Sequence, residues 1–80
     1  MPFAYLVKCR DGSLYAGWTT DIDKRLAAHN AGKGGAYTRS RRPVELAYRE
    51  EFETRREARQ READFKKMNR KEKLALIARG

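Results

Sequence analysis

Five side chains that could handle protons, phosphates or a metal ion are spread along these 80 residues: Tyr5, Tyr15, Arg25, His29 and Glu62. A phenol can position a water molecule or take a proton from it. At pH 7, however, only about one phenol in a thousand is ionised, since its ordinary pKa is about 10. Arginine stays charged and pairs with phosphate oxygens through two hydrogen bonds. This chemistry is useful only if the fold brings the five groups together.

Whether the two tyrosines share a face depends on the turn between them. A two-residue loop at 11–12 is the usual choice for an Asp-Gly pair, but it would place Tyr5 and Tyr15 on opposite faces. A three-residue loop at 10–12, with a left-handed glycine, instead pairs Tyr5 with Gly17 and keeps both tyrosines on one face. This register also gathers an apolar face: Ala4, Leu6, Leu14, Ala16 and Trp18. We therefore predict the three-residue loop, in a hairpin from about residue 3 to 18.

The rest of the chain alternates helix signals with one further strand. Thr20 with Asp23 predicts a helix start, and the capping box of Thr54 and Glu57 predicts another. Asn69 with Glu72 resembles a third cap. The predicted elements are a helix to about residue 30, a loop at 31–43, a strand at 44–49, a helix from 55 to about 68, and a helix from 70 with Leu74, Ile77 and Ala78 on its apolar side. The fold class is α+β: one domain, residues 1–80, with a three-stranded antiparallel sheet and about three helices.

The helix after the hairpin carries two of the candidate groups. Arg25 and His29 lie one turn apart, so both could meet a single phosphate. Each also has a simpler interpretation. Arg25 could be an ordinary surface residue, and His29, in line with Ile22 and Leu26, could be a hydrogen-bonded core histidine.

Glu62 shares a helical stripe with Ala58 and Phe65, which predicts that it faces the protein interior. A carboxylate there is costly to desolvate unless it has a partner. That partner could be a cation such as Arg25 or Arg61, or a metal ion.

The charge distribution points to a polyanionic partner. The net charge is +8, and residues 31–43 carry four basic side chains and no acid. Such a balance favours nucleic acid, although a basic surface without a partner is the alternative. The predicted nucleic-acid-binding residues are Lys33, Tyr37, Arg39, Arg41 and Arg42, with Tyr37 offering a ring on which a base could stack.

Other functional classes find little support in the composition. The single cysteine, Cys9, excludes an intramolecular disulfide and is expected to be a buried thiol. No apolar run approaches the roughly 20 residues that span a membrane, and no signal-peptide pattern opens the chain, so we expect a cytoplasmic protein.

Taken in order, Ala4-Tyr5-Leu6, Tyr15-Ala16-Gly17, Arg25-x-x-x-His29 and Glu62 resemble the GIY-YIG nuclease superfamily, and more closely its short stand-alone bacterial members. The resemblance covers nearly the whole chain. It implies a metal-dependent endonuclease that hydrolyses phosphodiester bonds in DNA, or less favourably RNA, with a preference for structure over sequence. A role in DNA repair or recombination would follow by analogy. The alternative is a non-catalytic nucleic-acid-binding or adaptor module on the same fold.

The resemblance also implies roles for the residues. Glu62 matches the single metal-binding glutamate, and one carboxylate suits a weakly held Mg²⁺ that keeps several waters. Tyr15 would act as the base and Tyr5 would orient it. Arg25 would neutralise the phosphate, with His29 assisting.

Overall fold

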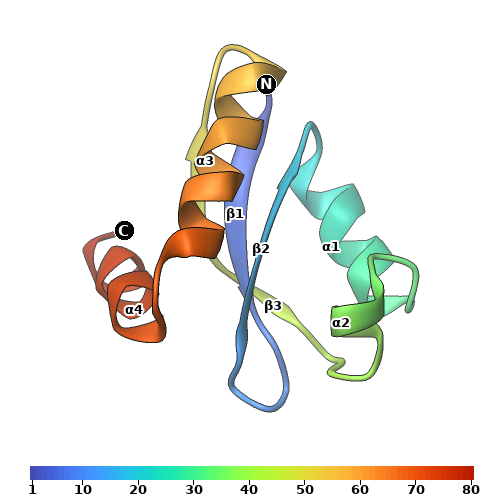
Figure 1. The fold of residues 1–80 in the computed structure, drawn as a ribbon. Coiled ribbons are helices and arrows are strands. Elements are labelled where there is room, and N and C mark those ends of the chain that lie inside the picture. The colour runs from blue at the N-terminus through green and yellow to red at the C-terminus, as the bar shows by residue number, and fades with distance from the viewer.

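The computed structural model describes residues 1–80 and shows a three-stranded antiparallel sheet with helices on both faces (Figure 1). The elements are β1 (Phe3–Lys8), β2 (Leu14–Thr19), α1 (Ile22–Asn30), α2 (Ala36–Arg39), β3 (Glu45–Glu51), α3 (Arg55–Lys67) and α4 (Arg70–Arg79). The strand order is β2-β1-β3, so β2 forms one edge. In Figure 1, α1 and α2 lie on one side of the sheet, and α3 and α4 lie on the other. The predicted α+β class is confirmed.

The hairpin has the predicted three-residue loop. Cys9 N–H donates to the Ser13 carbonyl at 2.8 Å, and Gly12 occupies the left-handed region with φ of 85°. In the resulting register, Tyr5 pairs with Gly17 and Val7 pairs with Tyr15. Both tyrosines therefore lie on the face covered by α1 and α2.

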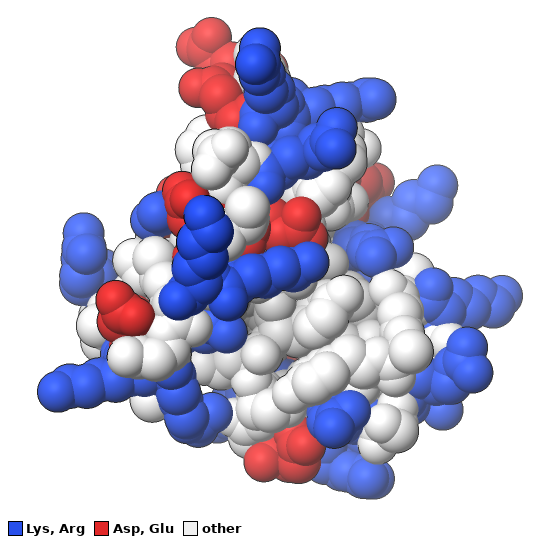
Figure 2. Space-filling model, in the orientation of Figure 1, with Lys and Arg blue, Asp and Glu red and all other residues white.

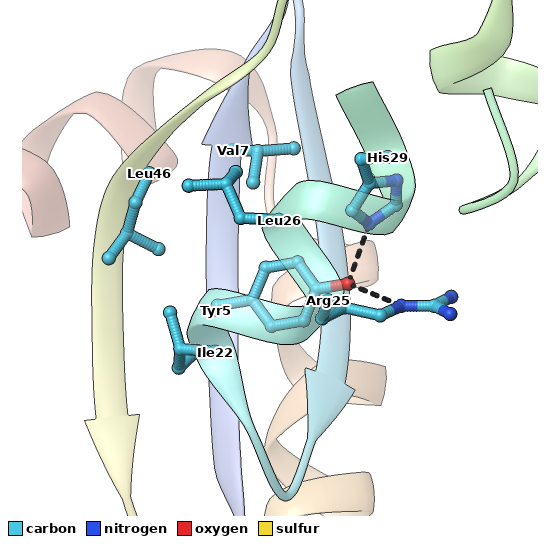
Figure 3. Close-up of a pocket in the computed structure, with 7 residues that line it drawn as sticks. All are labelled: Tyr5, Val7, Ile22, Arg25, Leu26, His29 and Leu46. Carbon is cyan, nitrogen blue, oxygen red and sulfur yellow. Dashed lines mark hydrogen bonds between the residues drawn. The ribbon is translucent and has the colours of Figure 1, made fainter. Parts of the chain in front are cut away.

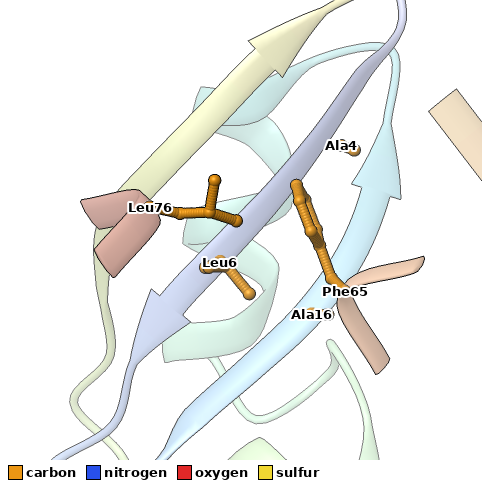
Figure 4. Packing of buried hydrophobic residues seen from close by; sticks show 5 residues of the cluster. All are labelled: Ala4, Leu6, Ala16, Phe65 and Leu76. Carbon is orange, nitrogen blue, oxygen red and sulfur yellow. The ribbon is translucent and has the colours of Figure 1, made fainter. Parts of the chain in front are cut away.

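The opposite face of the hairpin forms a separate apolar core. It consists of Ala4, Leu6, Ala16, Phe65 and Leu76 (Figure 4). Phe65 from α3 and Leu76 from α4 are the helical contributions, so this core fixes both helices against the sheet. Leu14 and Trp18, which the predicted register also places on this face, are only half-buried.

The apolar side of α4 differs from the prediction. Leu76 is buried and Ile77 packs against the same core, whereas Leu74 is 44% exposed and Ala78 is exposed. Every residue from 74 to 78 is apolar, so periodicity alone could not select the buried side. Packing of Leu76 and Ile77 against the core formed with Phe65 distinguishes the buried side instead.

Two of the three predicted helix caps are confirmed. Thr54 and Asn69 both form capping boxes, with Glu57 and Glu72 respectively. The cap of α1 is wrong by one residue, because Asp21 rather than Thr20 accepts from Lys24 N–H, at 3.0 Å.

The segment before α3 departs from the prediction in two ways. The loop at 31–43 contains the short helix α2, and β3 runs over 45–51 rather than 44–49. A register shift also occurs in β3, where Leu6 pairs with Tyr48 but Val7 pairs with Leu46. This bulge at Ala47 sends Leu46 toward the Tyr5 side of the sheet and Tyr48 toward Phe65.

A candidate active site around Tyr5 and Tyr15

Tyr5 is the side chain that joins the sheet to α1. It is only 2% exposed, and its hydroxyl lies 2.9 Å from Nε2 of His29 and 3.3 Å from Nε of Arg25 (Figure 3). The ring crosses directly over Gly17 on β2. A Cβ at that position would overlap the phenol oxygen, so only glycine leaves room for Tyr5.

The hydrogen bonds around Tyr5 continue through His29 and have one consistent direction. Arg25 can only donate, so the Tyr5 oxygen accepts from it. At the other end, the Gly35 carbonyl can only accept, and the Thr38 hydroxyl donates to it at 3.4 Å. The Thr38 oxygen is then free to accept from Nδ1–H of His29 at 2.8 Å, which leaves Nε2 to accept from Tyr5. This arrangement requires a neutral histidine.

The surroundings of His29 favour the same neutral form. Burial lowers the pKa of His29 below its usual value, and the nearby charge of Arg25 lowers it further. The side chain is completely buried and both of its nitrogens are engaged. A direct contact between His29 and a phosphate would require these bonds to break. The geometry instead assigns His29 to holding Tyr5.

The phenol of Tyr5 is also held in its protonated form. Burial raises its pKa; the hydrogen bond and charge of Arg25 oppose this, and Tyr15 and Glu62 add to the rise. Tyr5 is therefore poorly suited to act as a base. It is well suited to orient its neighbours.

Tyr15 offers a contrasting phenol. Its ring meets His29 edge-on, with centroids 5.7 Å apart, and stacks on Tyr37 from α2 at 5.4 Å. The ring is thus fixed, yet its hydroxyl forms no hydrogen bond within the protein. Because Tyr15 is only half-buried, this hydroxyl can meet water or a substrate.

Arg25 is half-buried and is oriented without being neutralised. Besides its contact with Tyr5, its Nη2 donates to the Gly34 carbonyl at 2.9 Å. No carboxylate forms an ion pair with it. Gly34 is also packed closely on His29, since a Cβ there would overlap Nδ1 of the ring. The guanidinium therefore keeps unpaired donors that could bind an anion.

Glu62 extends from α3, which packs on β2 and β1 from the other side of the sheet. Its side chain is 22% exposed, and its only ion pair is with Lys66, at 3.4 Å. The expected alternative pairing with Arg25 or Arg61 is absent, because Arg61 binds Glu50. Glu62 nevertheless lies close enough to Tyr5 for its charge to raise the pKa of that phenol.

The donor set around Glu62 limits the kind of divalent cation that could bind. No three acidic, histidine or cysteine side chains converge anywhere in the chain, which does not fit a tightly held metal. A single half-buried carboxylate beside one flexible lysine does fit a weakly held Mg²⁺ that retains several waters.

The five predicted nucleic-acid-binding residues fall into two groups. Lys33 and Arg39 are exposed, and their side chains form no hydrogen bond or ion pair. The other three make contacts within the protein. Arg41 pairs with Asp11 at 3.1 Å and lies 4.0 Å over the Tyr37 ring, and Arg42 donates to the Arg39 carbonyl at 2.9 Å. In the view of Figure 2, Lys and Arg side chains project from much of the outline and also cross the middle of the face, above a largely uncharged area.

A crevice beneath Tyr5 is too small to hold a substrate. It encloses about 10 Å³, roughly the space of one water, between α1 and the sheet (Figure 3). Any chemistry on a nucleic acid must therefore occur at the surface, where the Tyr15 hydroxyl and the guanidinium of Arg25 are accessible.

Two participants in the site, Thr38 and Gly34, were not among the residues predicted from the sequence. Thr38 is fully buried and fixes Nδ1 of His29, while Gly34 supplies the carbonyl that holds Arg25. A glycine pair followed three residues later by threonine was the available signal. That pattern indicates a role in the site only because α2 folds against α1 and brings Thr38 to His29.

The class of protein follows from this fold and from a comparison with known families. Residues 1–75 match the family model described as the GIY-YIG catalytic domain, and the chain therefore belongs to the GIY-YIG nuclease superfamily. The predicted family is thus confirmed. A GIY-YIG nuclease domain implies nucleic acid as the partner. None of the helices in the structure is long and apolar enough to cross a membrane.

Several small bacterial proteins are similar to this chain over nearly its whole length. The UPF0213 protein of Bacillus pumilus is 61% identical over 75 residues, which cover 94% of this chain and 76% of that protein. The UPF0213 protein YazA of Bacillus subtilis is 58% identical over the same length and with the same coverage. The solution NMR structure of a UPF0213 protein from Bacillus halodurans has a TM-score of 0.61 at 39% identity, covering 98% of this chain and 84% of that one.

Proposed function

We propose that this protein is a magnesium-dependent endonuclease that hydrolyses phosphodiester bonds in DNA, with RNA as the less favoured substrate. The observation that carries the proposal is the contrast between the two tyrosines. Tyr5 is buried and fully bonded, whereas the Tyr15 hydroxyl is fixed in place, accessible and without a partner. Superfamily membership supplies the reaction class.

In this proposal, Tyr15 accepts a proton from the water that attacks phosphorus. An ordinary phenol costs about 4 kcal/mol to ionise at pH 7, so phenolate needs stabilising charge nearby. Arg25 uses its free donors to bind the phosphate oxygens as negative charge develops. The Tyr5–His29–Thr38 chain keeps that guanidinium in position.

Glu62 would hold one magnesium ion, which when bound supplies positive charge to the departing oxygen. Lys66 competes with the ion for this carboxylate, but only modestly, because its side chain is largely exposed and can move away. Substrate phosphate would complete the site, in keeping with weak binding of the ion to the protein alone.

Selectivity for structure over sequence is expected from the kind of contacts on offer. The free cations near the site suit backbone phosphates, which position a nucleic acid but carry no base information. A panel of nicked, flapped, branched and single-stranded DNA would identify the preferred shape. A role in repair or recombination would fit a preference for nicks, flaps or branches.

The test is nicking of supercoiled plasmid in the presence of magnesium. We expect Glu62→Ala to lose at least about 100-fold in rate, while Glu53→Ala, which removes an exposed carboxylate elsewhere, should match the wild type. Equal rates for Glu62→Ala and the wild type would refute the assignment. Salt-sensitive DNA binding without any cleavage would instead identify a non-catalytic binding or adaptor module.

A further inference from the structure

A second basic feature lies away from the tyrosines, at the end of α1 that follows His29. It is an open hollow of about 550 Å³, lined by Arg10, Asn30, Arg39, Ser40, Arg42 and Pro43. Three of these six residues are arginines and none is acidic. The lining comes from the hairpin loop, the end of α1, the end of α2 and the segment before β3, so the fold assembles it from four separate places.

Two of the three arginines have no partner within the protein. The side chains of Arg10 and Arg39 are exposed and form neither a hydrogen bond nor an ion pair. Like charges gathered without a counter-charge repel one another, and the repulsion weakens when an anion binds among them. This arrangement therefore favours a bound anion.

Two other side chains that line the hollow, Arg42 and Asn30, are held in place by hydrogen bonds. Arg42 donates to the carbonyls of Arg39 at 2.9 Å and Asn30 at 3.4 Å, which orients its guanidinium and leaves Nη2 free. The Asn30 amide is itself held by Val44, accepting at 2.7 Å and donating at 3.0 Å. An anion entering the hollow would thus meet one arginine already fixed and two that can close on it.

The position of the hollow relative to Arg25 suggests the source of the anion. Arg25 and Asn30 are five residues apart on α1, or about 7.5 Å along the helix axis. This axial rise corresponds to only a few nucleotide steps of about 3.4 Å, so one nucleic-acid strand could reach both Arg25 and the hollow. We propose that the hollow formed by Arg10, Arg39 and Arg42 binds one backbone phosphate of the nucleic acid, close along the strand to the phosphate that is cleaved. This inference rests on the proposed function and adds a phosphate subsite with Arg10 as a contact.

The experiment measures binding of a fluorescent single-stranded oligonucleotide over a series of salt concentrations, in a chelator so that nothing is cleaved. The variant combines Arg10→Gln with Arg39→Gln. The control combines Arg55→Gln with Lys71→Gln, which removes two exposed cations outside the hollow. We expect the variant's salt dependence to be shallower than the wild type's by about 0.7, the value for one single-strand phosphate, and its affinity to fall about tenfold. The control should keep most of the wild-type slope.

If the variant and the control showed the same salt dependence of oligonucleotide binding, the proposal would be overturned. The loss of two positive charges, wherever they lie, would then explain the weaker binding. A second arm melts the wild type and the Arg10→Gln/Arg39→Gln variant with inorganic phosphate or with chloride at equal ionic strength. If inorganic phosphate stabilised the wild type but not the variant, while both proteins bound the oligonucleotide equally, the hollow would be assigned to free phosphate. That result would also overturn the proposal. A protein that never cleaves DNA would leave the binding comparison fully readable, so the two proposals fail separately.

Discussion

The hydroxyl of Tyr5 lies 2.9 Å from Nε2 of His29, across 24 residues of chain, and this contact joins the central strand to α1. Because the same hydroxyl also accepts from Arg25, a single phenol fixes both helical residues that the sequence offered as phosphate ligands. His29 is thereby fully engaged in the interior, whereas Arg25 is oriented and keeps donors for a substrate.

Replacing Tyr5 with phenylalanine should therefore affect stability and activity together. Tyr5→Phe leaves the buried Nε2 of His29 without a donor, at a cost of about 1–3 kcal/mol in the free energy of unfolding. It also releases Arg25, so plasmid nicking should slow by about tenfold or more. Urea denaturation and a nicking assay measure the two effects.

The matched control is Tyr48→Phe on the other face of the sheet. That change removes a hydrogen bond of 2.5 Å to Glu50 and should cost stability, but nicking should stay near the wild-type rate. Similar losses of activity in both variants would show that Tyr5 contributes only through stability.

Tyr15→Phe should lose activity while keeping the stability of the wild type, which is the reverse of the result expected for Tyr48→Phe. The hydroxyl has no partner in the folded protein, so its removal should change the free energy of unfolding by less than about 0.5 kcal/mol. The rate of cleavage should fall by about 100-fold to 10,000-fold, the range expected for loss of a general base. A stable variant that still cleaves at the wild-type rate would remove Tyr15 from the mechanism.

Arg25→Lys preserves charge but not shape. A lysine cannot hold Tyr5 and the Gly34 carbonyl while also gripping two phosphate oxygens, because it lacks the planar fork of arginine. We expect kcat to fall by roughly 10-fold to 100-fold with the protein still folded. Lys24→Arg, on the exposed side of the same helix, is a control for changes in α1 and should have no effect.

Acid should destabilise the protein over a pH range that is set by the lowered pKa of His29. Its pKa is lowered in the folded state by burial and by Arg25, so between that value and about 6.5 the unfolded chain binds more protons. The stability supplied by the neutral imidazole is fully present above about pH 6.5 and is lost as the pH falls toward the folded pKa. Since this is the only histidine, NMR can follow its ring protons directly. A titration midpoint at or above about 6.5 would contradict the burial account.

The carboxylates with shifted pKa values act in a lower range and should not obscure that window. Hydrogen bonds from Ser13 lower the pKa of Asp11. Burial alone would raise the pKa of Glu50, but hydrogen bonds from Arg61 and Tyr48 outweigh it and lower that pKa. The stability that Asp11 and Glu50 contribute is lost only as the pH falls below about 4.5 and through their pKa values in the folded protein.

Local signals predicted much of the fold. The turn chemistry at Gly12 selected the register that places both tyrosines together, and the capping boxes of Thr54 and Asn69 placed the starts of α3 and α4. The hairpin turn and the helix caps are formed by residues that are close in the chain, so their interactions can be predicted from the sequence.

What depended on distant contacts could not be predicted. The bulge at Ala47 and the rotation of α4 are set by packing against other elements, and neither leaves a periodic pattern. The same holds for the site. Arg41 and Arg42 are basic residues in a basic loop, yet their partners, Asp11 and the helix-end carbonyls of Asn30 and Arg39, are apparent only in three dimensions.

The most direct test of a one-carboxylate, metal-dependent nuclease is the rate of plasmid nicking as a function of magnesium concentration, for the wild type and for Glu62→Gln. Glutamine keeps the shape of the side chain and removes its charge. The wild-type rate should rise with magnesium and level off, with no cleavage in a chelator, while Glu62→Gln should stay at least about 100-fold slower at the plateau. Superimposable curves for the two proteins, or nicking by the wild type in the chelator, would contradict the account.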